Sequence, residues 1–179
     1  MLEDKRLVWK LKRGDAGALR RIYEKYRNTL LTVAVSLLNE TAAAKDILHD
    51  VFVSFAEDVE SFHLYGSLKN HLITCVVNRV RDRFRSEIYQ MVEINQKRIK
   101  NSDADHAETL LAREQPQFLI EALAELPEHQ REVVILHLQG GMKFREIAEM
   151  QHISINTTLG RYRYGLDKLS SILNRQVAE

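Results

Sequence analysis

The stretch FREIAEMQHISINTTLGRYRY, residues 144–164, decides the fold of this chain. Residues 144–150 have the apolar pattern of a short helix, and a tight turn is predicted at residues 151–153. Ser154 is a favoured N-cap, so a longer helix is expected to begin directly after it. Two helices joined by so short a turn form a helix-turn-helix, whose second helix can enter the major groove of DNA.

The second helix of this pair has two unlike faces. At about 100° per residue, the predicted buried face consists of Ile155, Thr158, Leu159, Tyr162, Leu166, Leu169 and Leu173. The opposite half carries groups that hydrogen-bond base edges and phosphates, namely Asn156, Thr157, Gly160, Arg161 and Tyr164, with Arg163 at the border. The sequence does not say which arginine contacts a base and which a phosphate. The alternative is a helical bundle that touches no DNA.

Two further helices are predicted before this pair. The first begins near Phe118 and turns Phe118, Leu119, Ala122 and Leu123 inward. Pro127 suits the first turn of the second helix, which is expected to end at Gly140-Gly141. Its apolar residues are Val133, Val134, Leu136 and Leu138.

The first half of the chain predicts four helices. A short one covers residues 3–12, and Asp15 caps the next, whose apolar face runs from Leu19 to Leu38. Thr41 is the expected N-cap of a third helix with the stripe Ala44, Ile47, Leu48, Val51, Phe52 and Phe55. Residues 58–67 read as a loop. The fourth helix spans residues 68–85, with Leu68, Leu72, Cys75, Val76 and Val80 inward.

Between the two halves the apolar periodicity stops. Residues 88–117 have no sustained apolar stripe and contain Pro116, which is typical of a linker, and a compact domain seldom holds so long a loop. The sequence therefore predicts an all-α protein: two small helical domains, residues 1–87 and 118–179, joined by a flexible linker, the second containing the helix-turn-helix.

The net charge of +1 is the sum of acidic and basic stretches that lie apart in the sequence. Residues 40–60 hold six acidic residues and one basic, residues 78–100 seven basic and three acidic, and residues 143–175 six basic and three acidic. The single cysteine, Cys75, excludes an intramolecular disulfide. The N-terminus lacks the apolar stretch of a signal peptide and no window is long enough to span a bilayer, so a cytoplasmic protein without a membrane segment is expected.

Several motifs, taken in order along the chain, resemble one protein family. They are Gly14-Asp15, KDILHDVF at residues 45–52, the set Asn78, Asp82 and Arg85, LPEHQREVV at residues 126–134, EIAE at residues 146–149, and Asn156-Thr157 followed by Arg161. This series resembles the extracytoplasmic-function sigma factors of the sigma-70 family of bacterial RNA polymerase sigma factors. The chain departs from the family pattern at Lys45, His49 and Asp50, at His71, where an aromatic residue is usual, and at Leu159 and Gly160, where a basic residue and a serine are usual.

The resemblance implies partners and roles. The partners are core RNA polymerase, promoter DNA and an anti-sigma protein that clamps both domains. The implied polymerase-binding residues are Asp46, Ile47, His49, Asp50 and Phe52. The implied contacts to melted −10 DNA are Phe62, Tyr65, Lys69, Asn78, Arg79, Asp82, Arg83 and Arg85. The final helix is the implied reader of the −35 element, through Asn156, Thr157, Gly160, Arg161, Arg163 and Tyr164.

Two other functions are weaker alternatives. A helix-turn-helix regulator that acts without polymerase leaves the first domain without a role, and binding to RNA polymerase distinguishes the two. An enzyme is suggested only by His49-Asp50, a dipeptide of metal-dependent phosphohydrolases. Such a site needs a histidine on an earlier helix, and His49 is the first histidine of the chain. We therefore expect no catalytic residues, no metal site and no cofactor.

Overall fold

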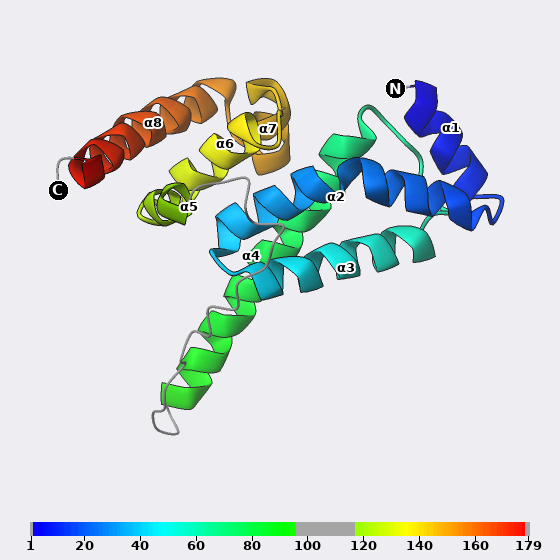
Figure 1. Ribbon diagram of the computed structural model, residues 1–179, viewed down its shortest axis with the longest axis horizontal. Helices are drawn as coiled ribbons and strands as arrows, with labels where there is room; N and C mark the ends of the chain where they lie inside the picture. Colours follow the sequence, from blue (N-terminus) through cyan, green and yellow to red (C-terminus); the bar gives the residue numbers. More distant parts are fainter. Residues whose placement is uncertain (1, 96–116, 178–179) are drawn as a thin grey trace.

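The computed structural model describes residues 2–95 and 117–177, so most of the predicted linker lies outside the described residues. In this part of the chain all regular structure is helical (Figure 1). The helices are α1 (Leu2–Leu11), α2 (Ala16–Leu38), α3 (Thr41–Glu57), α4 (Leu68–Asn95), α5 (Gln117–Ala124), α6 (Glu128–Leu138), α7 (Phe144–Gln151) and α8 (Ile155–Val177). The predicted all-α fold is confirmed, and α4 continues eight residues past the predicted boundary at residue 87.

Local signals fix both ends of α2. The Asp15 carboxylate accepts a hydrogen bond from the backbone N–H of Gly17 at 2.9 Å, as an N-cap of α2 does. Asn39 ends the same helix in the left-handed conformation, with φ of 55°. Two predictions were wrong by one position. Glu40, not Thr41, occupies the N-cap of α3, and Pro127 precedes α6 as its N-cap instead of lying in its first turn.

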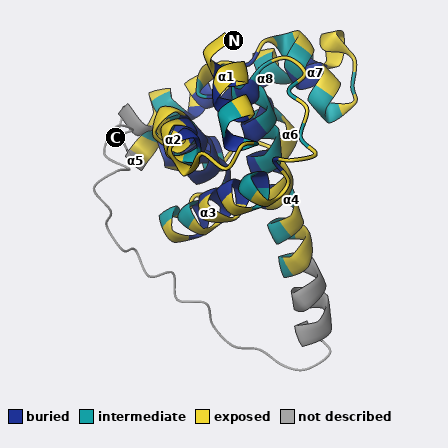
Figure 2. Ribbon diagram, turned by 90° about the vertical axis from the view of Figure 1, so that its right-hand side faces the viewer, coloured by how far each residue is buried: buried dark blue, intermediate teal, exposed yellow. Residues whose placement is uncertain are grey.

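The first domain is a bundle built around α2. Helices α1, α3 and α4 all pack against it (Figure 1). The predicted stripe of α3 is buried throughout, and Ile22, Leu30 and Val33 of α2 are fully enclosed. Figure 2 shows these buried stripes on the inner sides of the helices, with exposed residues along the outer sides.

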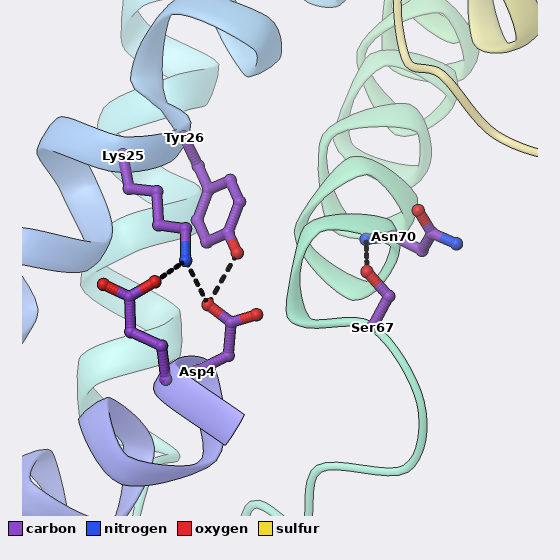
Figure 3. Close-up of polar contacts among 6 residues, drawn as sticks. Asp4, Lys25, Tyr26, Ser67 and Asn70 are labelled. Atoms are coloured by element: carbon purple, nitrogen blue, oxygen red, sulfur yellow. Dashed lines mark hydrogen bonds and ion pairs between the residues drawn. The ribbon is translucent and has the colours of Figure 1, made fainter. Parts of the chain in front are cut away.

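A polar cluster fastens α1 to α2. The Asp4 carboxylate accepts hydrogen bonds from the Tyr26 hydroxyl at 2.7 Å and the Lys25 ammonium at 2.9 Å (Figure 3). Burial, together with the hydrogen bond to Asp4, raises the pKa of Tyr26 to about 12, so the phenol stays protonated as a donor. Figure 3 also shows Ser67, whose hydroxyl accepts a hydrogen bond from the backbone N–H of Asn70 at 3.4 Å and so caps the start of α4.

The two domains pack directly on each other. Helices α5 and α6 both contact α2 (Figure 1), and one continuous apolar core includes residues from all eight of these helices. Gly140, after α6, sits so close to Ile73 of α4 that a Cβ at Gly140 would lie 3.3 Å from the Ile73 Cδ1. The sequence pattern did not place Ile73 or Val77 inward, yet both are fully buried. The face of α4 that carries Ile73 is covered by the second domain.

In α5 and α6, two residues that were predicted to face inward are exposed instead. Phe118 is 52% exposed and Leu138 is 56% exposed, whereas the half-buried Cys75 of α4 does pack against the core as predicted. Phe118 and Leu138 lie at the ends of α5 and α6, and an apolar pattern does not reveal where the neighbouring helix stops. Ile120 and Ile135 take the inward positions instead.

Candidate nucleic-acid interface

The predicted helix-turn-helix is present as α7 and α8. His152 ends α7 in the left-handed conformation, with φ of 55°, and its backbone N–H bonds to the carbonyls of Ala148 and Glu149. The Ser154 hydroxyl then accepts a hydrogen bond from the backbone N–H of Thr157 at 3.0 Å, which confirms it as the cap of α8. At the other end of α7, the Glu146 carboxylate accepts from the backbone N–H of Lys143 at 2.7 Å. The start of α8 is therefore held in a fixed direction.

The exposed face of α8 differs in part from the predicted one. Four of the predicted DNA-reading residues are exposed: Asn156, Thr157, Arg163 and Tyr164. Ile155 and Leu159 were predicted to be buried, and this is wrong, because they are 46% and 41% exposed. The buried face is turned by about 60° from the predicted line, and it is centred on Thr158, Gly165, Leu169 and Ile172.

A glycine explains this rotation. A Cβ at Gly165 would lie 2.8 Å from the Val134 Cγ2, so at this position the backbone of α8 packs directly against a side chain of α6. A helical projection that counts only apolar side chains gives no weight to a glycine and therefore misses the close approach at Gly165. The physical signal for the true face was a small residue, not a large one.

The two arginines of α8 have different surroundings. The Arg161 guanidinium is half-buried and donates a hydrogen bond to the Gln151 side-chain carbonyl at 3.2 Å. Arg163 is exposed, and its guanidinium carbon lies 5.9 Å from the centre of the Tyr164 ring. Arg163 is thus the guanidinium group that α8 presents to solvent on its exposed face, whereas Arg161 is turned toward α7.

A second set of candidate residues lies along α4. Asn78, Arg79, Asp82 and Arg85 are exposed and Arg83 is half-buried. The Arg79 guanidinium donates to the neutral Ser54 hydroxyl at 2.8 Å, so no acid neutralises its charge in that bond. Arg83 is paired with Glu40 at 3.1 Å and Glu87 at 2.9 Å, and Arg85 with Asp82 at 3.2 Å. Exposed pairs of this kind contribute about 0–1 kcal/mol, which a phosphate can readily replace.

The two aromatic candidates in the loop before α4 differ in their exposure. Tyr65 is 89% exposed beside Gly66, whose φ is 86°. Phe62 is half-buried, with its ring centre 5.3 Å from that of Phe55 and 4.6 Å from that of His71. Tyr65 is therefore available to a ligand, and Phe62 anchors the loop.

The predicted polymerase-binding residues of α3 also include both exposed and buried side chains. Asp46, His49 and Asp50 are exposed, while Ile47 and Phe52 are each 6% exposed. Between α2 and α3 lies a groove of about 700 Å³, lined by Leu19, Tyr23, Leu31, Leu48, His49, Phe52 and Val53 among others. Tyr23 and Val53 keep 37% and 41% of their surface exposed, so the groove presents apolar side chains to solvent.

One network of hydrogen bonds was not predicted from the sequence. The Arg81 guanidinium of α4 donates twice to the Glu132 carboxylate of α6, at 2.5 and 3.2 Å. The Gln151 amide donates to the same carboxylate at 2.6 Å, and Gln151 in turn accepts from Arg161. The available signal was Glu132 itself, a charged residue beside Val133-Val134, because a carboxylate in a buried stripe needs a partner.

Residues 2–95 and 117–177 contain no group of three or more histidine, cysteine or acidic residues placed to hold a metal ion. Over the same residues, no helix is long and apolar enough to cross a membrane.

Comparison with known proteins agrees with this arrangement. Residues 22–87 match the family "Sigma-70 region 2", and residues 119–158 match "Sigma-70, region 4". The ECF RNA polymerase sigma factor EcfG of Rhodopseudomonas palustris is 24% identical over 157 residues, which is 84% of this chain and 82% of that protein. The ECF RNA polymerase sigma factor SigW of Bacillus subtilis is 21% identical, over 92% of this chain and 94% of that protein.

Two solved structures share the fold. The sigma factor RpoE of Bartonella quintana, in complex with the anti-sigma factor NepR, has a TM-score of 0.70 at 22% identity, over 87% of this chain and 96% of that one. CnrH, in complex with the cytosolic domain of CnrY, has a TM-score of 0.71 at 22% identity, over 97% of this chain and 98% of that one.

Two helical domains that match regions 2 and 4 in this order define an RNA polymerase sigma factor, a class of initiation factors and not of enzymes. The chain belongs to the sigma-70 family, within its extracytoplasmic-function group.

Proposed function

We propose that residues 1–87 bind core RNA polymerase and open the −10 DNA, while residues 118–179 read the −35 element as duplex. The observation that carries this division is the exposed face of α8. Asn156, Thr157, Arg163 and Tyr164 remain open to solvent although the two domains are packed together. A long polar and basic helix face at the end of a helix-turn-helix is suited to the major groove.

The α2–α3 groove supports a polymerase-docking role for the first domain. It places the apolar side chains of Tyr23 and Val53 in solvent, next to the exposed His49. The carboxylates of Asp46 and Asp50 lie on the same helix. Exposed apolar surface with a charged rim is typical of a protein-binding site, and a regulator that acts without polymerase has no use for it.

The loop and the basic face of α4 support a role in opening DNA. Tyr65 offers an exposed ring on which an unpaired base can stack. Arg79 offers a cation whose bonded partner, Ser54, is neutral. We further infer that the protein acts in the cytoplasm with polymerase, has no catalytic activity of its own, and is held inactive by an anti-sigma protein that contacts both domains.

Reconstituted transcription tests the proposal. The full chain is added to core RNA polymerase with a library of bacterial genomic fragments, and the 5′ ends of the transcripts are sequenced. We expect initiation at a defined set of positions that share a −10 and a −35 element, absent with core enzyme alone. Random initiation, or no stable complex with core enzyme, contradicts the proposal. Specific DNA binding without polymerase binding favours the regulator.

A further inference from the structure

The reading face of α8 carries an apolar residue that its proposed contacts leave unexplained. Leu159 is 41% exposed one turn after the start of the helix, and Ile155, four positions earlier, is 46% exposed. On the helix it neighbours Asn156 and Arg163, three and four positions away, and both are exposed. A leucine in this place either stays exposed to solvent without a binding role or becomes buried when DNA binds.

The next residue favours the second explanation. Glycine inside a helix is about 1 kcal/mol less favourable than alanine, so an interior glycine usually has a packing reason. Gly165 has one, because its Cβ would meet Val134 at 2.8 Å. Gly160 has none among residues 2–95 and 117–177, because a Cβ there would meet no atom of these residues within 4 Å. The space beside Leu159 is therefore kept open on the outer face of the helix.

A double helix offers one apolar group at this depth. In the major groove the C5-methyl of thymine is the apolar feature of the base edges, and small or aliphatic side chains contact it. Asn156, on the same face, can pair in a bidentate way with an adenine. Leu159, with room beside it at Gly160, complements a methyl group next to that base.

We propose that Leu159 is a specificity-determining residue that contacts a thymine methyl group in the −35 element, with Gly160 leaving room for the close approach. This inference rests on the proposed function, since it requires α8 to lie in the major groove. It assigns Leu159 to DNA recognition instead of to the helix core.

The test separates the methyl group from the rest of the base. The full chain with core RNA polymerase is used to select binding sites from a duplex library randomised over the −35 region. Each thymine of the selected site is then replaced singly by deoxyuridine, which keeps the Watson–Crick pairing and lacks only the methyl. We expect one replacement to weaken binding of the wild-type holoenzyme about fourfold, the ratio that burial of one methyl supplies.

Two variants assign the effect to its residue. Leu159→Ala is expected to bind thymine and deoxyuridine sites within about a factor of 1.5 of each other, because the contact is gone. Leu138→Ala removes another exposed leucine of the same domain, on α6 instead of α8, and should keep the fourfold discrimination. Thermal melts of both variants check that the fold is unchanged.

Three results would overturn the proposal. Equal affinity of the wild type for every deoxyuridine site, or a selected site without thymine, removes the methyl contact. Unchanged discrimination by Leu159→Ala assigns the contact to another residue. In each of these cases the holoenzyme still binds a selected site. Failure to select any site at all contradicts the proposed function itself and the inference with it.

Discussion

The Arg81 guanidinium of α4 and the Glu132 carboxylate of α6 form a bidentate ion pair, and this pair joins the two domains. The Glu132 residue is 6% exposed, so its charge is compensated inside the protein and not by water. A second bond between the same segments is weaker, with the Lys69 ammonium 3.4 Å from the Gly141 carbonyl oxygen. The contact between the domains therefore includes a side-chain pair whose members lie 51 positions apart.

Glu132→Gln should loosen the contact between the domains. The change keeps the shape of the side chain and removes its charge, and hydrogen bonds to charged groups contribute about 1.5–3 kcal/mol. We expect a larger radius of gyration in small-angle X-ray scattering and a lower Tm. Arg85→Gln, which removes an exposed pair within α4, is the matched control. An unchanged radius of gyration in Glu132→Gln would show that the apolar contacts alone keep the domains packed.

The double substitution Asp46→Arg with Asp50→Arg should weaken binding to core RNA polymerase by at least about tenfold, or about 1.4 kcal/mol. Both carboxylates are exposed on α3, so the swap alters the surface field with little effect on stability. Asp167→Arg, an exposed change on α8, controls for total charge. A fluorescence titration against core enzyme measures the affinity. Equal affinities for wild type and double variant would remove these residues from the docking surface.

Tyr65→Ala with Lys69→Ala should reduce open-complex formation more than it reduces binding to duplex −35 DNA. Tyr65 is 89% exposed, so its loss leaves the fold intact. Phe62→Ala is the contrasting variant, because Phe62 packs against Phe55 and His71. Its expected effect is a loss of stability of about 2 kcal/mol. Permanganate footprinting reports the melted bases, and normal melting by the double variant would assign promoter opening to another element.

Arg163→Ala should lower −35 binding by at least about tenfold, or about 1.4 kcal/mol. Arg163 presents its charge on the reading face, whereas Arg161 already bonds to Gln151, so Arg161→Ala is expected to have the smaller effect. Arg175→Ala, an exposed arginine near the end of α8, is the control. Fluorescence anisotropy of the holoenzyme on the selected duplex and on a scrambled one distinguishes a base contact from a phosphate contact. A larger loss for Arg161→Ala would reverse the assignment.

His71 should make the stability of the first domain depend on pH. Burial among aromatic side chains lowers the pKa of His71 below its ordinary value of 6.5. As the pH falls below 6.5, the unfolded chain takes up the proton first, so the stabilisation present at neutral pH is lost toward the lower folded-state pKa. We expect the Tm to fall between pH 8 and pH 5.5 by more in the wild type than in His71→Phe. Equal falls would mean that other groups dominate.

Much of the fold follows from short-range signals. Asp15 and Ser154 cap their helices as predicted, and the apolar stripe of α3 is buried at every predicted position. The exposed positions of Asn156 and Tyr164 were also predicted. Each of these features depends on residues within about four positions of one another, so the sequence alone was sufficient to determine the helices, their order and the helix-turn-helix.

Only the tertiary structure decided which faces meet. Gly140 lies against the buried Ile73, and Gly165 brings α8 close to Val134 while Leu159 of the same helix is exposed. Glu132 meets Arg81 because the second domain packs on α4. These contacts join residues far apart in the chain, often through a glycine that adds nothing to an apolar pattern. Close packing between elements therefore set the rotation of the reading helix and the contact between the domains.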